Sequence, residues 1–145
     1  MAKFEKSVLI ERPAETVWKF IADFSNVMKS TPHAPDLRQV SSGALGLGTT
    51  FSGKDGRVTL ELRITEFSPN QRLVAEFVKP GFVKGTTDVY RLEEIDEKTR
   101  LTETWDTRLN GLYRLLGPFF APRTKRDVTA RLDNIKRTLE LERVP

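Results

Sequence analysis

The sequence predicts an α+β fold in which a curved antiparallel sheet packs against a long C-terminal helix. Residues 58–65, within the expected strand 57–67, alternate between apolar and polar side chains, the period of a half-buried strand. The last third of the chain repeats its apolar residues at steps of three and four, the period of an amphipathic helix. Since no helical pattern separates the middle segments, neighbouring strands are expected to run antiparallel.

Length and composition suit one soluble globular domain over residues 1–145, with 38% hydrophobic and 30% charged residues. No apolar run approaches the ~20 residues that span a bilayer. The chain has no cysteine, which excludes disulfides, thiolate catalysis and cysteine-ligated metals. Charges interrupt the apolar residues of the N-terminus, so no secretory signal is expected and a cytoplasmic location is predicted.

The first elements are a strand and two helices. Residues 4–11 alternate as a strand does, and Pro13 suits the first turn of a helix. That helix has a buried face of residues at three- and four-residue steps, with a second short helix expected over 25–29. The apolar face comprises Val17, Phe20, Ile21 and Phe24. Pro32 and Pro35 then predict a loop.

Six or seven strands joined by short turns account for the middle of the chain. The segments with strand patterns are 36–43, 49–53, 57–67, 72–79, 85–95 and 100–109. The sequence GALGLGTTF, residues 43–51, lies among them. No lysine follows its last glycine and no helix follows it, so a phosphate-binding loop is excluded. Glycines that accept positive φ instead predict a chain reversal there.

The C-terminal helix is predicted over about residues 122–142. At ~1.5 Å per residue it spans roughly 30 Å, long enough to cross the sheet. Its apolar stripe consists of Val128, Leu132, Ile135 and Leu139. Gly117, Pro118 and Pro122 predict a kinked or separate helical turn upstream. There, an apolar lid and ordinary packing remain alternatives for Leu115, Leu116, Phe119 and Phe120.

Basic and acidic residues mix on this helix, which is typical of a solvated face. An RNA or acidic membrane surface is the alternative, but no aromatic stacking platform accompanies the charges. The net charge of +4 is too small by itself to imply nucleic acid.

Five segments together resemble the START-like (SRPBCC) superfamily, which includes polyketide cyclase/dehydrase-type and Bet v 1-like proteins. They are IERPAETVWKFIADFSN (10–26), SSGALGLGTTF (41–51), TEFSPNQRLVAEF (65–77), YRLEEIDEKTRLTETW (90–105) and GLYRLLGPFFAPRTKRDVTARLDNIKRTLE (111–140). The resemblance implies a helix-grip fold, in which the sheet wraps around the long helix and leaves a cavity for an apolar ligand.

Strand alternation then predicts which side chains face that cavity. Val58 lies on the same face as Leu60. On the next-to-last strand, Thr86 lies on the same face as Asp88 and Tyr90, and on the last strand Thr107 lies on the same face as Glu103 and Trp105. The predicted ligand-binding residues are Leu60, Leu62, Ile64, Phe77, Asp88, Tyr90, Glu103, Trp105, Val128, Leu132 and Ile135. Trp18 is assigned to the core or the cavity wall.

Asp88, Glu103, Tyr90 and His33 are the candidate catalytic residues. A carboxylate in an apolar cavity is costly unless it is paired or protonated, so Asp88 and Glu103 could bind ligand or act as acids with a raised pKa. Alternatively the cavity mouth is wet, Arg131 neutralises one of them, or a bulge turns one outward. His33 lies in the predicted loop near the entrance, where simple exposure explains it.

Three functions follow as hypotheses. The first is binding of a hydrophobic small molecule such as a lipid, a quinone or a polyketide-like compound. The second, implied by the resemblance, is a polyketide cyclase, aromatase or dehydratase, and the third is a protein-interaction or co-chaperone-like role. We expect no cofactor, no metal, no nucleic acid and no stable membrane insertion, and a monomer or homodimer.

Overall fold

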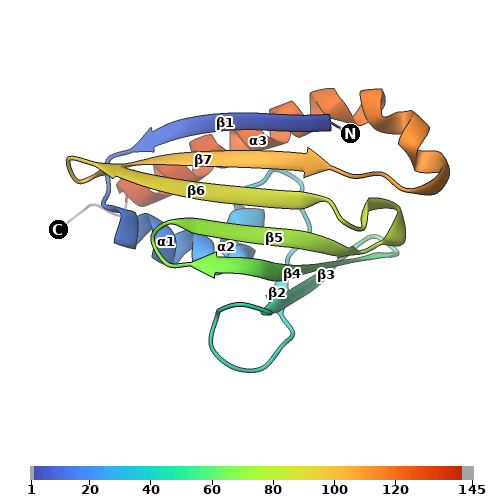
Figure 1. Cartoon of the computed structure of the whole chain (residues 1–145), viewed down its shortest axis with the longest axis horizontal. Helices are drawn as coiled ribbons and strands as arrows, with labels where there is room; N and C mark the ends of the chain where they lie inside the picture. The colour runs from blue at the N-terminus through green and yellow to red at the C-terminus, as the bar shows by residue number, and fades with distance from the viewer. Residues whose placement is uncertain (1, 142–145) are drawn as a thin grey trace.

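The computed structural model describes residues 2–141 and forms one curved, seven-stranded antiparallel sheet with its helices on one face (Figure 1). The strands lie in the order β1-β7-β6-β5-β4-β3-β2. Their bounds are β1 Ala2–Ile10, β2 Arg38–Gln39, β3 Thr50–Asp55, β4 Val58–Ser68, β5 Arg72–Lys79, β6 Thr87–Ile95 and β7 Lys98–Thr107. The helices are α1 Ala14–Ala22, α2 Phe24–Lys29 and α3 Gly117–Leu141, with 3-10 turns η1 Gly81–Val83 and η2 Gly111–Leu116.

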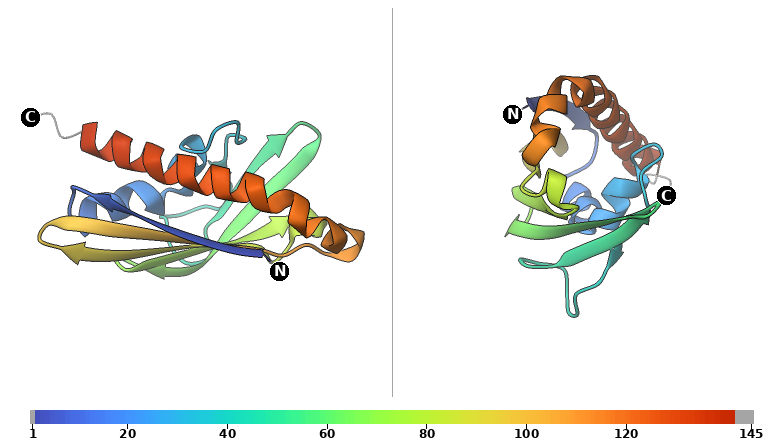
Figure 2. Two further views of the ribbon diagram at one scale, coloured as in Figure 1. Left: turned by 90° about the horizontal axis from the view of Figure 1, so that it is seen from above. Right: turned by 90° about the vertical axis from the view of Figure 1, so that its right-hand side faces the viewer.

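The strands from β2 to β7 form a continuous meander, and β1 joins it by pairing with β7. Register shifts between β4 and β5 fall at Glu61/Leu62 and at Ile64/Glu66. Such irregularities bend a strand and increase its twist, so they help the sheet to curl toward the helices. Seen along its length, the sheet wraps partly around α3 (Figure 2). The predicted helix-grip fold is therefore confirmed.

The apolar stripe of α3 packs into the concave face of the sheet. Val128, Leu132, Ile135 and Leu139 are each at most 2% exposed. They belong to the same buried cluster as Leu62, Ile64 and Leu101 from the strands and Val17 and Ile21 from α1. Burial of this stripe is the main reason for an amphipathic helix to dock.

Two predicted boundaries were wrong. The strand expected over 36–43 is only the two residues of β2, because Gln39 and the following residues use their polar groups within the loop, with Gln39 Nε2 donating to the carbonyls of Ser41 and Gly43. The long helix begins at Gly117, five residues before the predicted start at Pro122. Pro118 is tolerated in the first turn, where backbone N–H groups lack helical partners, and Pro122 is enclosed within the helix. The predicted end at residue 142 lies outside the described residues.

The glycine-rich segment is a loop between β2 and β3, as predicted. Gly43 and Gly48 have φ of 95° and 85°, the region that glycine adopts without steric cost. No helix among the described residues is long and apolar enough to cross a membrane.

Candidate functional site

A cavity of about 330 Å³ lies between the sheet and the N-terminal half of α3. The sheet contributes Asp55, Val58, Leu60, Phe77, Trp105 and Thr107, and α3 contributes Phe120, Arg123, Thr124, Asp127, Val128 and Arg131. Met28 of α2 also lines the cavity. The loops and the η1 turn contribute Thr31, Pro32, His33, Ala34, Pro35, Pro80, Phe82, Val83, Thr86 and Leu109. Most of these surfaces are apolar, and residues such as Pro32 and Arg123 that are exposed to solvent form the rim.

The cavity occupies one end of the sheet. Along one strand or helix, some residues of the inward face line the cavity and the next ones on that face belong to the core. On β4, Leu60 lines the cavity whereas Leu62 is fully buried in the core. On α3, Val128 lines it whereas Leu132 does not. Side chains therefore fill one end of the space between the sheet and α3 and leave a cavity at the other end.

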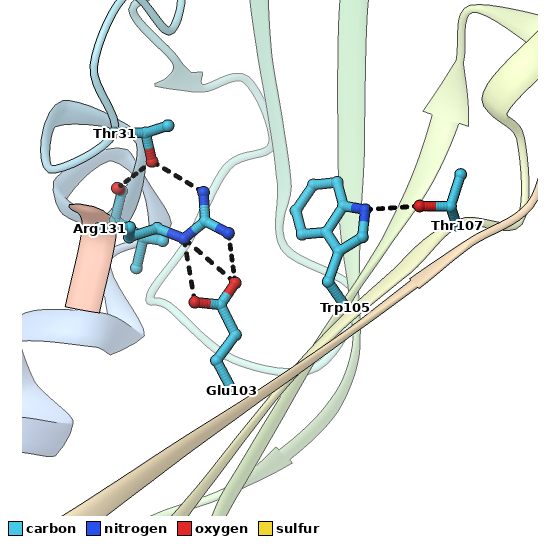
Figure 3. Close-up of polar contacts among 6 residues, drawn as sticks. Thr31, Glu103, Trp105, Thr107 and Arg131 are labelled. Carbon is cyan, nitrogen blue, oxygen red and sulfur yellow. Dashed lines mark hydrogen bonds and ion pairs between the residues drawn. The ribbon is translucent and has the colours of Figure 1, made fainter. Parts of the chain in front are cut away.

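A buried ion pair stands at the boundary between cavity and core (Figure 3). Arg131 is 3% exposed and contacts Glu103, which is fully buried, through both Nε and Nη2. Nη1 of Arg131 donates to Thr31 Oγ1 at 2.9 Å, so α3, β7 and the loop after α2 meet at this guanidinium. Burial opposes the positive charge, but the adjacent Glu103 raises the pKa of Arg131 above its ordinary value.

Trp105 lines the cavity next to this ion pair. The guanidinium carbon of Arg131 lies 5.2 Å from the centre of the Trp105 ring, a cation–π distance. The indole Nε1 donates to Thr107 Oγ1 at 3.0 Å, and the ring packs edge-on against Phe77 at 5.4 Å. Figure 3 shows Trp105 and Thr107 beside the Arg131–Glu103 pair. These contacts fix the orientation of the cavity's most polar wall.

Asp88 and Tyr90 lie behind that wall on β6. Cross-strand pairing places Asp88 opposite Trp105 and Tyr90 opposite Glu103, so both carboxyl groups are on the same face of the sheet. Asp88 is 1% exposed, and burial, together with the charge of Glu103, raises its pKa well above 3.8. Burial and the neighbouring Asp88 likewise raise the pKa of Tyr90 well above 10.0. Asp88 therefore favours its neutral, protonated form inside the fold.

The structure places four of the predicted ligand-binding residues in the cavity wall, namely Leu60, Phe77, Trp105 and Val128. The other seven lie on the predicted faces but do not line the cavity, and these are Leu62, Ile64, Asp88, Tyr90, Glu103, Leu132 and Ile135. Strand and helix periodicity identifies a face, but it does not say how far along that face the core ends. Trp18, assigned to the core or the wall, is in the core.

His33 lies at the rim, exposed and with φ of 61°, apart from the buried carboxyl groups. The loop residues Thr31, Ala34 and Pro35 and the η1 residues Phe82 and Val83 were not predicted as site residues. Their pattern carries no periodic signal, and only the packing of loops against the sheet edge brings them to the cavity. Among the residues that the structure describes, no cluster of histidine and acidic side chains could hold a metal ion.

A model of the family described as polyketide cyclase/dehydrase and lipid transport matches residues 1–140. No curated protein matches the chain in sequence. Among solved structures, the Zhui aromatase/cyclase from Streptomyces sp. R1128 has a TM-score of 0.74 at 18% identity, over 96% of this chain and 93% of that chain.

A protein from Thermus thermophilus has a TM-score of 0.77 at 15% identity, over 99% of this chain and 100% of that one. Ara h 8.0201 has a TM-score of 0.68 at 14% identity, over 95% of this chain and 97% of that one. At such low identities the likeness to these structures establishes a common fold.

Proposed function

Because the chain belongs to the polyketide cyclase/dehydrase and lipid transport family, we propose that it binds a hydrophobic small molecule in the cavity between sheet and α3. The observation that carries this proposal is the cavity itself. It is largely apolar, it is about 330 Å³ in volume, and a few oriented polar groups stand at its inner end. Small-molecule sites generally combine these features in this size range.

The apolar wall supplies affinity and the polar end supplies orientation. Each CH₂ group that leaves water for this wall contributes about 0.8 kcal/mol. A guanidinium has five N–H donors, and the contacts of Arg131 to Glu103 and Thr31 use three of them. Arg131 can therefore donate to a carbonyl or similar oxygen of a guest, which suits a lipid, a quinone or a polyketide-like ligand.

Titration with the neutral fluorescent hydrophobe N-phenyl-1-naphthylamine tests this proposal. Replacement of Leu60, a cavity-wall residue, by the larger tryptophan should reduce the affinity about tenfold or more, because the indole occupies guest space. Leu9→Trp, at an exposed position on β1, is the matched control and should leave the affinity unchanged. Equal affinity for Leu60→Trp and the native chain would refute the cavity as the binding site.

Native mass spectrometry after gentle purification complements the titration. A co-purifying hydrophobe whose retention falls in Leu60→Trp but not in Leu9→Trp would identify the natural ligand class. No binding of added hydrophobe to the native chain in either measurement would remove the proposal.

A cyclase, aromatase or dehydratase activity is the second candidate, favoured by the family match and by the group Asp88, Glu103 and Tyr90 behind the polar wall. None of these three side chains lines the cavity, which supports binding ahead of catalysis. If Asp88 is a catalyst, Asp88→Asn should abolish turnover of a poly-β-keto substrate. A carrier should lose little affinity in the same variant.

The protein-interaction role, the absence of nucleic acid and of cofactors, the oligomeric state and the cytoplasmic location stay predictions.

A further inference from the structure

The segment before and at the start of α3 exposes an unusual amount of apolar surface. Five large apolar side chains fall within eight consecutive positions: Leu112, Tyr113, Leu115, Leu116 and Phe119, with Leu112, Leu115 and Phe119 between 78% and 84% exposed. Elsewhere in the described chain, no two large exposed apolar residues lie closer than seven positions in the sequence. Clustered exposed apolar side chains mark contact surfaces, whereas single ones are ordinary.

Positive charge accompanies this apolar cluster. Residues 111–126, the entrance segment, contain four basic residues and no acidic one. These are Arg114, Arg123, Lys125 and Arg126, all exposed. The first acidic residue downstream is Asp127, whose carboxylate lies 3.7 Å from Arg123 Nε. The mixture of basic and acidic side chains that was expected along the whole helix is therefore present only in the part of α3 after residue 126.

The entrance segment also adjoins the cavity. Phe120, Arg123 and Thr124 line it from α3. The η2 turn is held beside η1, since the rings of Phe82 and Tyr113 stack at 4.3 Å and the Asn110 backbone N–H donates to the Phe82 carbonyl at 2.9 Å. Figure 2 shows η2 and the start of α3 together at one end of the molecule. The exposed apolar cluster is thus on the side where the cavity has its rim.

We propose that the entrance segment docks onto an anionic lipid membrane, with its apolar side chains in the interfacial region and its basic side chains against the headgroups. A bilayer surface offers both partners at once, an apolar layer and negative charge above it. Nucleic acid would satisfy the charges but would leave the leucines and Phe119 in water. This docking is peripheral, and it requires no ligand in the cavity. If the cavity binds a hydrophobe as proposed, docking brings the rim to the membrane.

Flotation of the full chain with vesicles tests the proposal. Vesicles of phosphatidylcholine alone and of an equal mixture of phosphatidylcholine and phosphatidylglycerol are compared at low and high ionic strength. Binding should be strong only to the anionic vesicles, and salt should weaken it because the Debye length falls from ~10 Å at 0.1 M to ~3 Å at 1 M.

Two variants separate the apolar and the charged contributions. Leu115→Gln/Phe119→Gln removes two of the most exposed apolar side chains and should weaken binding about tenfold or more. Arg114→Gln/Lys125→Gln/Arg126→Gln should weaken it roughly a hundredfold, since each basic residue near an anionic surface contributes about fivefold. Neither variant alters a residue that lines the cavity.

Matched controls alter the same chemistry elsewhere on the surface. Leu47→Gln removes another exposed leucine, and Arg57→Gln/Arg63→Gln/Arg137→Gln removes three exposed charges. Both should bind vesicles within about twofold of the native chain if the entrance segment is the site. Circular dichroism verifies that every variant is folded.

Several outcomes would overturn the proposal: no binding to anionic vesicles, equal losses in variants and controls, or binding that salt does not weaken. Another result would also overturn it: the native chain is a dimer that binds no vesicles, and Leu115→Gln/Phe119→Gln is a monomer. This face would then be an interface between two copies of the chain. Dye titration in the absence of lipid is independent of all these results, so failure of docking and failure of the cavity proposal are distinguishable.

Discussion

Arg131 and Glu103 form an ion pair almost without access to solvent, and this burial decides what the pair contributes to stability. Both charges lost their hydration on folding, and each now depends on the other and on Thr31 for compensation. Removal of one partner leaves an uncompensated buried charge, whereas removal of both leaves an apolar contact.

We expect Arg131→Met to lower the free energy of unfolding by about 3–5 kcal/mol, because the Glu103 charge would remain buried without its partner. The double variant Glu103→Leu/Arg131→Met should recover most of this loss. Urea unfolding of the two single variants, the double variant and the native chain gives the coupling energy as a double-mutant cycle.

Arg100→Met is the surface control for this cycle. Arg100 Nη1 lies 3.7 Å from Glu93, and both side chains are more than half exposed, so its loss should cost less than about 1 kcal/mol. A cost for Arg131→Met that is as small as that of the control would contradict the structural role assigned to the buried pair.

Asp88 gives the protein a pH dependence with a defined sign. Its pKa in the folded protein is well above the ordinary 3.8, since burial and the nearby Glu103 disfavour the charged form, more than Arg131 favours it. Between these two pKa values the folded state holds a proton that the unfolded chain releases. The stabilising contribution is therefore complete below about pH 3.8 and is lost as the pH rises through the folded pKa.

Asp88→Asn removes this titration. The unfolding free energy of the native chain relative to Asp88→Asn should therefore decrease as the pH rises from about 4 through the raised pKa of folded Asp88. Urea unfolding at a series of pH values measures it, with Asp133→Asn, an exposed position on α3, as the control. A constant or increasing difference between the native chain and Asp88→Asn would show that Asp88 is charged in the fold.

At the scale of the elements, β3 and the loop that follows α2 approach each other so closely that only glycine fits at residue 53. A Cβ there would overlap the backbone carbonyl of Asp36 and press against the Leu37 side chain. Because residues 31–35 of the same loop line the cavity, this contact helps to set the position of the cavity wall.

Gly53→Ala should therefore destabilise the fold by about 1–3 kcal/mol, the usual cost of overpacking. Gly46→Ala is the matched control, since nothing lies within 4 Å of a Cβ there and its φ is ordinary. It should be neutral or slightly stabilising. Thermal unfolding measures both, and a neutral Gly53→Ala would mean that the loop moves away freely.

The elements themselves were predictable because each has a local cause. The alternation of residues 58–65 and the stripe from Val128 to Leu139 are direct consequences of burying one face, and they appear in the sequence as periods of two and of three to four. The start of α3 was not predictable in the same way. Prolines 118 and 122 suggest a break, yet one lies in a tolerant first turn and the other is accommodated inside the helix.

The lining of the cavity was predicted only in part, and the physical reason is different. Alternation placed Leu60 and Leu62 on one face, but only the three-dimensional packing around each residue decides that the first lines the cavity and the second fills the core. The pairing of Glu103 with Arg131 was foreseen as one of several alternatives. The contributions of η1 and of residues 31–35 depend on contacts between segments far apart in the chain, and no local pattern records them.

At the scale of the whole molecule, the two ends of the sheet–helix sandwich differ in how they are stabilised. One end is a filled apolar core, and the other end is a cavity bounded by loops, η1 and the first turns of α3. The buried ion pair separates them. Local stability follows buried apolar contact, so the two ends should open with different free energies.

Amide hydrogen exchange along α3 measures that difference within one helix. Residues 117–127 contain no buried side chain, whereas Val128, Arg131, Leu132, Ile135 and Leu139 are buried. Amides of the first part should therefore exchange much faster than those of 132–139, which open only with the core. Saturating N-phenyl-1-naphthylamine should slow exchange in 117–127, since Phe120, Arg123 and Thr124 would contact the guest, and should leave 132–139 nearly unchanged. Uniform exchange along the helix would mean that the cavity end of α3 is as stable as the core end. Protection by the dye confined to 132–139 would mean that the dye does not contact residues 117–127.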